Sequence, residues 1–252
     1  MNHPITLITG ASRGLGKSMA LSLADAGHDI IITYQEHADA AESVVSEVIE
    51  KGCRAIALQL DLGESTTFPG FTQEVKSALE THWPQQKLDH LVNNAGMAAD
   101  SLMQECNEDT LDLLYNVHFK GSTLLTCELL PLLNDGGAVL NVSSGLARFT
   151  LPGYGPYAAM KGAIETATKY WAKELGDRHI RVNVLAPGAI ETDFGGGRVR
   201  DNADINQFVA SQTALGRVGL PDDIGAITAL LLSPAAYWIT GQRIEASGGM
   251  FL

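Results

Sequence analysis

The chain has 252 residues, of which 45% are hydrophobic and 18% charged, and its formal net charge is −12. This composition is typical of one large globular domain, and without a run of Lys or Arg it argues against a nucleic-acid partner. The sequence has no uninterrupted apolar stretch of 18 residues, and its start lacks the basic patch and apolar core of a signal peptide. We therefore expect a cytoplasmic protein with no membrane partner.

Short apolar runs rich in β-branched residues alternate with longer helical patterns along the chain. We expect strands at 5–9, 29–34, 53–61, 88–94, 137–144, 180–186 and 242–247, and helices at 14–26, 38–51, 66–82, 108–133, 156–176 and 222–232. Most of the strand runs are apolar throughout, which marks strands buried on both faces. The alternation predicts a single α/β domain over residues 1–252, a Rossmann-type doubly wound parallel sheet of about seven strands with helices on both faces.

The segment FGGGRVRDNADINQF at 194–208 is poor in periodic pattern. Three glycines followed by mixed polar residues are typical of a mobile loop, with room for a short helix. Because loops beyond the carboxyl ends of parallel strands are where such sheets bind ligands, we expect a substrate lid around 190–212.

The segment TGASRGLG joins the first expected strand to the first expected helix and contains Gly10, Gly14 and Gly16. Glycine lets the backbone approach a pyrophosphate closely, and a helix N-terminus points free N–H groups at its negative charge. Any tight turn also favours glycine. The position directly after a buried strand nevertheless favours a dinucleotide site.

The end of the second strand bears on the choice of nicotinamide cofactor. NAD sites usually carry an acidic residue there to hold the ribose 2′-OH. Here Tyr34 and Gln35 occupy that place, Glu36 lies just beyond, and Arg13 of the glycine loop is placed to meet a 2′-phosphate. We expect NADPH; the alternative is NAD, with Glu36 turned inward and Arg13 merely solvated.

Two tyrosines stand close together in PGYGPYAAMK, and only Tyr157 is followed four residues later by a lysine, Lys161. Residues four apart share one face of a helix. An ammonium beside a phenol favours the phenolate and lowers its pKa from about 10. The pair is thus a candidate acid and its electrostatic partner, although a surface Tyr/Lys pair would give the same spacing; Tyr154, followed by Ala158, has no such partner.

Three cysteines, Cys53, Cys106 and Cys127, are widely spaced and odd in number, which suits neither a disulfide framework nor a zinc site. We expect buried free thiols. The seven histidines show no metal-ligand spacing either, so we expect no catalytic metal. We interpret His118 and His179 as partly exposed helix or loop residues.

Over nearly its whole length the chain resembles the short-chain dehydrogenase/reductase family, in particular its NADPH-dependent reductases of ketones and 3-oxoacyl thioesters. The resemblance rests on TGASRGLG, LQLDL, LDHLVNNAG, YNVHFKG, LNVSSG, YAAMK, APGAIET, LGRVGLPDDIG and ITGQRIEASGG, which occur in the family's order. One departure is ASGG, where many members have Asp before the paired glycines. It touches the last strand and leaves the chemistry untouched.

The resemblance implies a catalytic set of Ser144, Tyr157, Lys161 and Asn116. Ser144 stands 13 residues before Tyr157, the family's spacing, which leaves Ser143 a capping or packing role. Tyr157 would be the general acid, Lys161 would lower its pKa and bind the nicotinamide ribose, and Ser144 would orient the carbonyl. Asn116 would hold a water that connects Lys161 to solvent; the alternative is an Asn bonded to nearby backbone.

The resemblance also implies which residues line the rest of the site. The expected cofactor contacts are Gly10, Ser12, Arg13, Gly14, Leu15, Gly16, Tyr34, Gln35, Asp61, Leu62, Asn93, Ala95, Gly96, Tyr157, Lys161, Pro187, Gly188, Ile190 and Thr192. Candidate substrate-pocket walls are Met97, Leu146, Arg148, Phe149, Tyr154 and Phe194, with ordinary packing as the alternative for each. Arg148 could pair with an acidic substrate.

These features predict an enzyme that reduces a small-molecule ketone to a secondary alcohol by hydride transfer from NADPH, with Tyr157 as the acid. One alternative is an NAD-dependent alcohol or polyol dehydrogenase. Another is a cofactor-sensing module without catalysis, whose expected signature is a broken Ser/Tyr/Lys set. By resemblance we expect a homotetramer, or a dimer, with Tyr170 and Trp171 of the segment 165–176 at the interface or, alternatively, packed on the chain's own sheet.

Overall fold

The computed structural model describes residues 3–252 and has one seven-stranded parallel sheet at its centre. The strands are β1 (Ile5–Ile8), β2 (Asp29–Tyr34), β3 (Ala55–Gln59), β4 (Leu88–Asn93), β5 (Leu133–Val142), β6 (Arg181–Pro187) and β7 (Arg243–Ala246). Their order across the sheet is β3-β2-β1-β4-β5-β6-β7, and every pair is parallel. This confirms the predicted α/β class and places all seven strands where the apolar runs predicted them.

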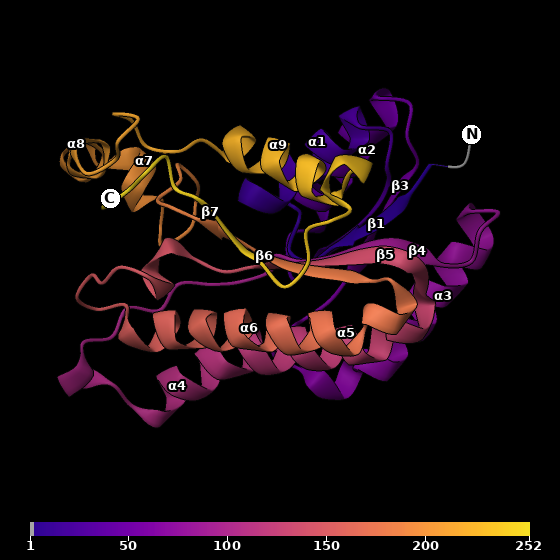
Figure 1. Ribbon diagram of the computed structural model, residues 1–252, viewed down its shortest axis with the longest axis horizontal. Helices are drawn as coiled ribbons and strands as arrows, with labels where there is room; N and C mark the ends of the chain where they lie inside the picture. The colour runs from indigo at the N-terminus through magenta and orange to yellow at the C-terminus, as the bar shows by residue number, and fades with distance from the viewer. Residues whose placement is uncertain (1–2) are drawn as a thin grey trace.

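Helices cover both faces of the sheet (Figure 1). They are α1 (Gly14–Asp25), α2 (Ala38–Glu50), α3 (Phe68–His82), α4 (Glu108–Tyr115), α5 (Ser122–Leu129), α6 (Gly155–Glu174), α7 (Arg198–Asp201), α8 (Ala203–Ser211) and α9 (Pro221–Leu232). Helices α1, α2 and α9 lie on one face, and α3, α4, α5 and α6 on the other (Figure 1). Each layer buries its own apolar cluster against the strands, because strands apolar on both faces need cover on both sides.

The structure corrects the prediction of one helix over residues 108–133. A π-helical segment, Asn116–Gly121, separates α4 from α5. Gly121 permits the close approach at its end, since a Cβ there would collide with the Leu62 backbone carbonyl. Segments of π-helix often lie at functional sites because they redirect side chains relative to a regular helix.

The region expected to form a lid contains the short helices α7 and α8. They lie beside the C-terminus, at the end of the molecule opposite the N-terminus (Figure 1). A small separate cluster of Val209, Val218 and Met250 holds this part together. Within residues 3–252, no helix is both long and apolar enough to cross a membrane.

Candidate active site

A cavity of about 860 Å³ opens at the carboxyl ends of the strands. Its lining comes from the glycine loop after β1, the segments that follow β2 to β6, the start of α6, and α7 and α8. The cavity spans the point where the chain order of the strands reverses, between β1 and β4. In doubly wound sheets this switch point is where ligands bind.

The glycine loop presents an anion site to this cavity. Helix α1 begins at Gly14, and the side chain of its N-cap residue, Arg13, makes no capping hydrogen bond. Gly10 and Gly14 have φ of 64° and 57°, which glycine adopts without strain. A Cβ on Gly16 would fall on the Gly10 carbonyl oxygen, so the turn has no space for a larger residue. Free N–H groups at a helix start beside Arg13 fit the pyrophosphate of a dinucleotide.

Nearly all predicted cofactor contacts lie on the cavity wall. These are Gly10, Ser12, Arg13, Gly14, Leu15, Gly16, Tyr34, Gln35, Asp61, Leu62, Ala95, Gly96, Tyr157, Lys161, Pro187, Gly188, Ile190 and Thr192. Asn93 is the exception: it is buried in β4, and its amide donates to Asn141 Oδ1 at 2.8 Å and to Thr126 Oγ1 at 2.9 Å. Its neighbour Asn94 lines the cavity instead and donates to Thr9 O and Gly10 O.

The two serines after β5 face different surroundings. Ser143 is buried, and its hydroxyl donates to Glu165 Oε1 at 2.6 Å, which is the structural role expected for it. Ser144 lies on the cavity wall, where its Oγ accepts the N–H of Leu146 at 3.2 Å. Because this bond uses a lone pair, the Ser144 hydrogen can still donate to a group in the cavity, such as the Tyr157 oxygen or a ligand.

Tyr157 and Lys161 lie one turn apart on α6, and both are buried on the cavity wall. The Lys161 Nζ lies 5.6 Å from the centre of the Tyr157 ring and donates to Val142 O at 2.8 Å. Burial lowers the pKa of Lys161 to about 8, because a desolvated ammonium is disfavoured. The predicted spacing thus brings the two side chains together in the cavity, not on the surface.

The pKa of Tyr157 differs from the sequence expectation. In the chain alone burial raises it well above its ordinary value, with a smaller raising effect from Tyr154, and a hydrogen bond with Ser144 only partly offsets this. Burial has the largest effect because the phenolate loses its solvation in the pocket. A phenolate at this position therefore depends on nearby positive charge, from Lys161 and from a ligand that enters the site.

Asn116 and His118 both line the cavity, but their surroundings differ from those expected. The Asn116 Oδ1 accepts from Lys120 Nζ, one turn along, at 3.2 Å. His118, interpreted above as partly exposed, is only 2% exposed and meets the Tyr157 ring edge-on, with ring centres 5.1 Å apart. Gly96 leaves room for the imidazole, because a Cβ there would lie 2.8 Å from His118 Cε1; nothing in the sequence pattern links the two positions.

The structure brings five of the six candidate substrate-pocket residues to the cavity. Met97, Leu146, Phe149, Tyr154 and Phe194 all line the cavity, whereas Arg148 does not. Sequence reasoning missed a further apolar group, contributed mostly by the lid region: Leu113, Leu151, Val199, Ile205, Phe208, Val209 and Met250. These residues look like ordinary helix and loop positions in the sequence, and only the fold brings them over the site.

Arg148 is held away from the cavity by an ion-pair network. Its guanidinium donates to both carboxylate oxygens of Glu245, at 2.6 and 2.7 Å. Arg243 bridges Glu245 at 2.8 Å to Glu165 at 2.7 Å and donates to Ser144 O at 3.3 Å. The network ties β7 to α6 and to the turn that contains Ser144. An acidic substrate would therefore have to displace Glu245 to reach Arg148.

We expect Glu245→Gln to lower the free energy of unfolding at pH 7 by about 2 kcal/mol, as for a partly buried ion pair. Burial alone would raise the pKa of Glu245, but hydrogen bonds from Arg148, Ser247 and Arg243 outweigh it and lower the pKa to about 2. Since the folded pKa lies below the unfolded one, this stabilisation is present above about pH 4.5 and is lost as the pH falls toward 2. Denaturant unfolding at pH 7 and pH 3 measures it.

The control is Asp201→Asn, which removes a carboxylate paired with Arg200 on the exposed surface. Exposed ion pairs contribute little, so this variant should unfold like the parent. Equal losses in the two variants, or a Glu245→Gln loss independent of pH, would contradict the role given to the network.

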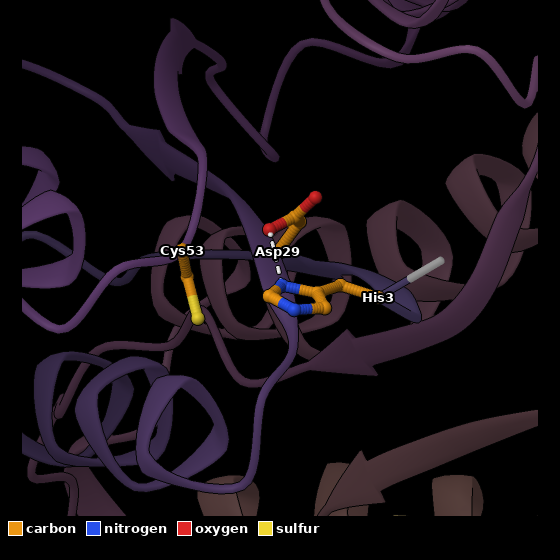
Figure 2. Close-up of side chains that lie close together, drawn as sticks. All are labelled: His3, Asp29 and Cys53. Carbon is orange, nitrogen blue, oxygen red and sulfur yellow. Dashed lines mark hydrogen bonds and ion pairs between the residues drawn. The ribbon is translucent and has the colours of Figure 1, made fainter. Parts of the chain in front are cut away.

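A second cluster, His3, Asp29 and Cys53, lies near the amino ends of β1, β2 and β3 (Figure 2). None of these three residues lines the cavity. Asp29 already accepts from His3, from the Arg54 N–H at 2.8 Å and from Trp83 Nε1 at 2.8 Å. The Cys53 thiol donates to Ala24 O, and burial raises its pKa, which disfavours the thiolate that a metal would bind. We interpret the cluster as a structural tie.

The three cysteines are free thiols, but only one of them is buried. Cys53 is buried, Cys106 is partly exposed, and Cys127 is exposed on α5. The expectation of three buried thiols is therefore wrong for two positions.

The sheet order and the cavity at its switch point define a Rossmann-type α/β protein, and the comparisons place it more closely. A family model described as enoyl-(acyl carrier protein) reductase matches residues 10–251. Versicolorin reductase of Emericella nidulans is 32% identical and the 3-oxoacyl-[acyl-carrier-protein] reductase of Staphylococcus aureus 34%; the alignments cover 100% and 98% of this chain and 97% of each relative.

Solved structures agree with these relatives. The angucycline C-6 ketoreductase LanV with bound NADP has a TM-score of 0.93 at 32% identity, over 98% of this chain and 95% of that one. The promiscuous reductase LugOII, which catalyses keto-reduction at C1 in lugdunomycin biosynthesis, has a TM-score of 0.93 at 33% identity, over 99% and 98%. The chain belongs to the short-chain dehydrogenase/reductase family.

Proposed function

We propose that this protein is an NADPH-dependent reductase that converts a ketone to a secondary alcohol. The observation that carries the proposal is that Ser144, Tyr157 and Lys161 line one cavity together with a glycine loop built for a pyrophosphate. An intact Ser/Tyr/Lys set argues against a silent cofactor-sensing module. The named activities of the reductases described above support ketone reduction over oxidation of a polyol.

The bound nicotinamide would supply the hydride, and the chain's own residues would handle the oxygen. Ser144 donates its free hydroxyl hydrogen to the carbonyl oxygen and orients it. Tyr157 passes its proton to that oxygen as negative charge develops. Lys161 holds positive charge close to the Tyr157 ring and so favours the tyrosinate that remains. The apolar wall keeps water from competing for the proton.

Replacing Arg13 tests the cofactor preference. The Arg13 side chain is 62% exposed, lies on the cavity wall, and has only a loose partner in Asp193 at 4.0 Å. Since a charged hydrogen bond to a 2′-phosphate contributes about 1.5–3 kcal/mol, Arg13→Met should weaken NADPH binding about 10-fold to 100-fold and leave NADH binding unchanged. Titration of both cofactors by fluorescence measures this.

Lys17→Met is the matched control, because Lys17 lies one turn further along α1 and pairs with Glu47 at 2.7 Å. An equal loss of NADPH binding in this variant would mean that the effect of Arg13→Met comes only from the change in net charge. Unchanged NADPH binding in Arg13→Met would instead favour selection through Glu36, which also lines the cavity.

The apolar and aromatic wall supports a ketone carried on a large apolar body. Phe149, Tyr154, Phe194 and Phe208 surround the region beyond Ser144 and Tyr157. A 3-oxoacyl thioester is the second candidate, because a relative is named for that activity.

The experiment that tests the function is to add NADPH or NADH and follow cofactor oxidation with polycyclic ketones, simple cyclic ketones and a 3-oxoacyl thioester. Turnover with NADPH supports the reductase. Tight NADPH binding without turnover of any ketone would favour the sensing module, and faster alcohol oxidation with NAD would favour the polyol dehydrogenase.

We also propose that the segment 190–212, which contains α7 and α8, acts as a substrate lid. We further propose that the protein is cytoplasmic and forms a homotetramer, or a dimer. Tyr170 is 65% exposed on α6, which suits an interface, whereas Trp171 packs against the chain's own core. The three free thiols suit a reducing compartment. A solution mass equal to one chain would contradict the oligomer.

A further inference from the structure

His118 is a buried imidazole for which the proposed mechanism has no role yet. It lies in the π-helical segment Asn116–Gly121, opposite the Tyr157 ring. Its side chain belongs to the same cavity wall as Tyr157 and Lys161. The irregular segment turns His118 inward toward α6, while Asn116 bonds along its own helix to Lys120.

The hydrogen bonds of His118 define its tautomer. Its Nε2 lies 2.8 Å from the Met97 carbonyl oxygen, which can only accept, so Nε2 carries the hydrogen. The Met97 N–H, 3.4 Å from the same nitrogen, is the weaker contact. The other ring nitrogen, Nδ1, is therefore an acceptor, and it is buried without a partner among the described residues. A buried unpaired acceptor is costly, which makes its position informative.

Two side chains that can donate lie around His118: the Tyr157 ring centre is 5.1 Å from the His118 ring centre and 5.6 Å from Lys161 Nζ. The titratable groups facing His118 are Tyr157 and Lys161, both on α6, and the segment after β4 contributes the Met97 carbonyl. Lys161 has three N–H donors, of which one is used by Val142 O. Burial, together with the positive charge of Lys161, lowers the pKa of His118 to about 3, so the imidazole is neutral and accepts at neutral pH.

We propose that His118 is a positioning residue: its Nδ1 accepts a hydrogen bond from a water that also binds the Lys161 ammonium, and this bridge holds the ammonium beside Tyr157. The inference rests on the proposed reductase function. In the reaction the carbonyl carbon gains a hydride, its oxygen gains the Tyr157 proton, and solvent returns one proton to the tyrosinate through Lys161. His118 gains and loses no proton.

The test is an ultraviolet titration of tyrosinate with and without added NADP⁺, in wild type, His118→Phe, His118→Leu and His118→Asn. Tyr157→Phe identifies which titration step belongs to Tyr157. His118→Phe and His118→Leu remove the acceptor, and we expect both to raise the pKa of Tyr157 in the NADP⁺ complex by about one unit. This corresponds to a tenfold smaller ionisation constant for the tyrosine. His118→Asn keeps an acceptor oxygen, so the pKa of Tyr157 in this variant should lie close to the wild-type value. The titration uses no ketone, so its outcome is separate from the search for a substrate.

His90→Phe is the matched control for loss of a buried imidazole. His90 on β4 is 8% exposed and also has an unpaired Nδ1, but it is not part of the cavity wall. We expect it to change stability without moving the Tyr157 step. A Tyr157 step that stays in place in both His118→Phe and His118→Leu would overturn the proposal. A raised Tyr157 pKa in Asn116→Ala, with no change in the His118 variants, would also overturn the proposal and would assign the positioning role to Asn116.

Discussion

Tyr157→Phe should lower kcat for ketone reduction by about 10²-fold to 10⁴-fold, the range that a positioned general acid contributes. The substitution removes only the hydroxyl. The ring keeps its edge-on contact with His118 at 5.1 Å and its contact with Phe194 at 5.9 Å, so the pocket should keep its shape. NADPH binding should stay within about threefold, far below the effect of a lost charged hydrogen bond. Stopped-flow reduction and fluorescence titration measure the two quantities.

Tyr170→Phe is the control, since that tyrosine is exposed on the same helix. Tyr154→Phe separates the two neighbouring tyrosines of the cavity: as a wall residue it should change KM more than kcat. A larger kcat loss in Tyr154→Phe than in Tyr157→Phe would reverse the assignment of the acid.

Periodicity and local spacing were enough to predict the sheet and the contact between Tyr157 and Lys161. Continuous apolar runs such as DIIITY can be stable only as strands covered on both faces. A four-residue spacing places Tyr157 and Lys161 on one helix face whatever the rest of the chain does. The glycine loop was predictable for the same reason, because close backbone approach restricts residue type locally.

Features that depend on contacts between distant segments were not predictable. Arg148 resembled a free pocket cation until the fold brought Glu245, 97 residues away, onto its guanidinium. His118 resembled a helix surface residue because helical periodicity assumes 3.6 residues per turn, and the π-helical segment changes that register. The apolar residues of the segment 190–212, such as Phe208, were missed because this segment lacks a periodic apolar pattern, and only the folded chain brings them to the cavity.

Lys161→Met should abolish most activity and yet stabilise the protein at pH 7. Lys161 is 5% exposed, and burial lowers its pKa from 10.5 to about 8. A folded pKa below the unfolded one means that the unfolded chain binds the proton more tightly, so the ammonium destabilises the fold below pH 8. The difference of about 2.5 units corresponds to roughly 3 kcal/mol, from which about 1 kcal/mol is subtracted for the lost bond to Val142.

A net gain of about 2 kcal/mol should raise Tm by several degrees at pH 7. Because the penalty disappears as wild-type Lys161 loses its proton, the gain should shrink as the pH rises through 8 toward 10.5. Lys169→Met, an exposed lysine on the same helix, should change neither Tm nor activity. A lower Tm in Lys161→Met at every pH would mean that Lys161 stabilises the fold through its contacts. Lower activity together with higher stability in Lys161→Met would mean that the buried charge of Lys161 serves catalysis at a cost in stability.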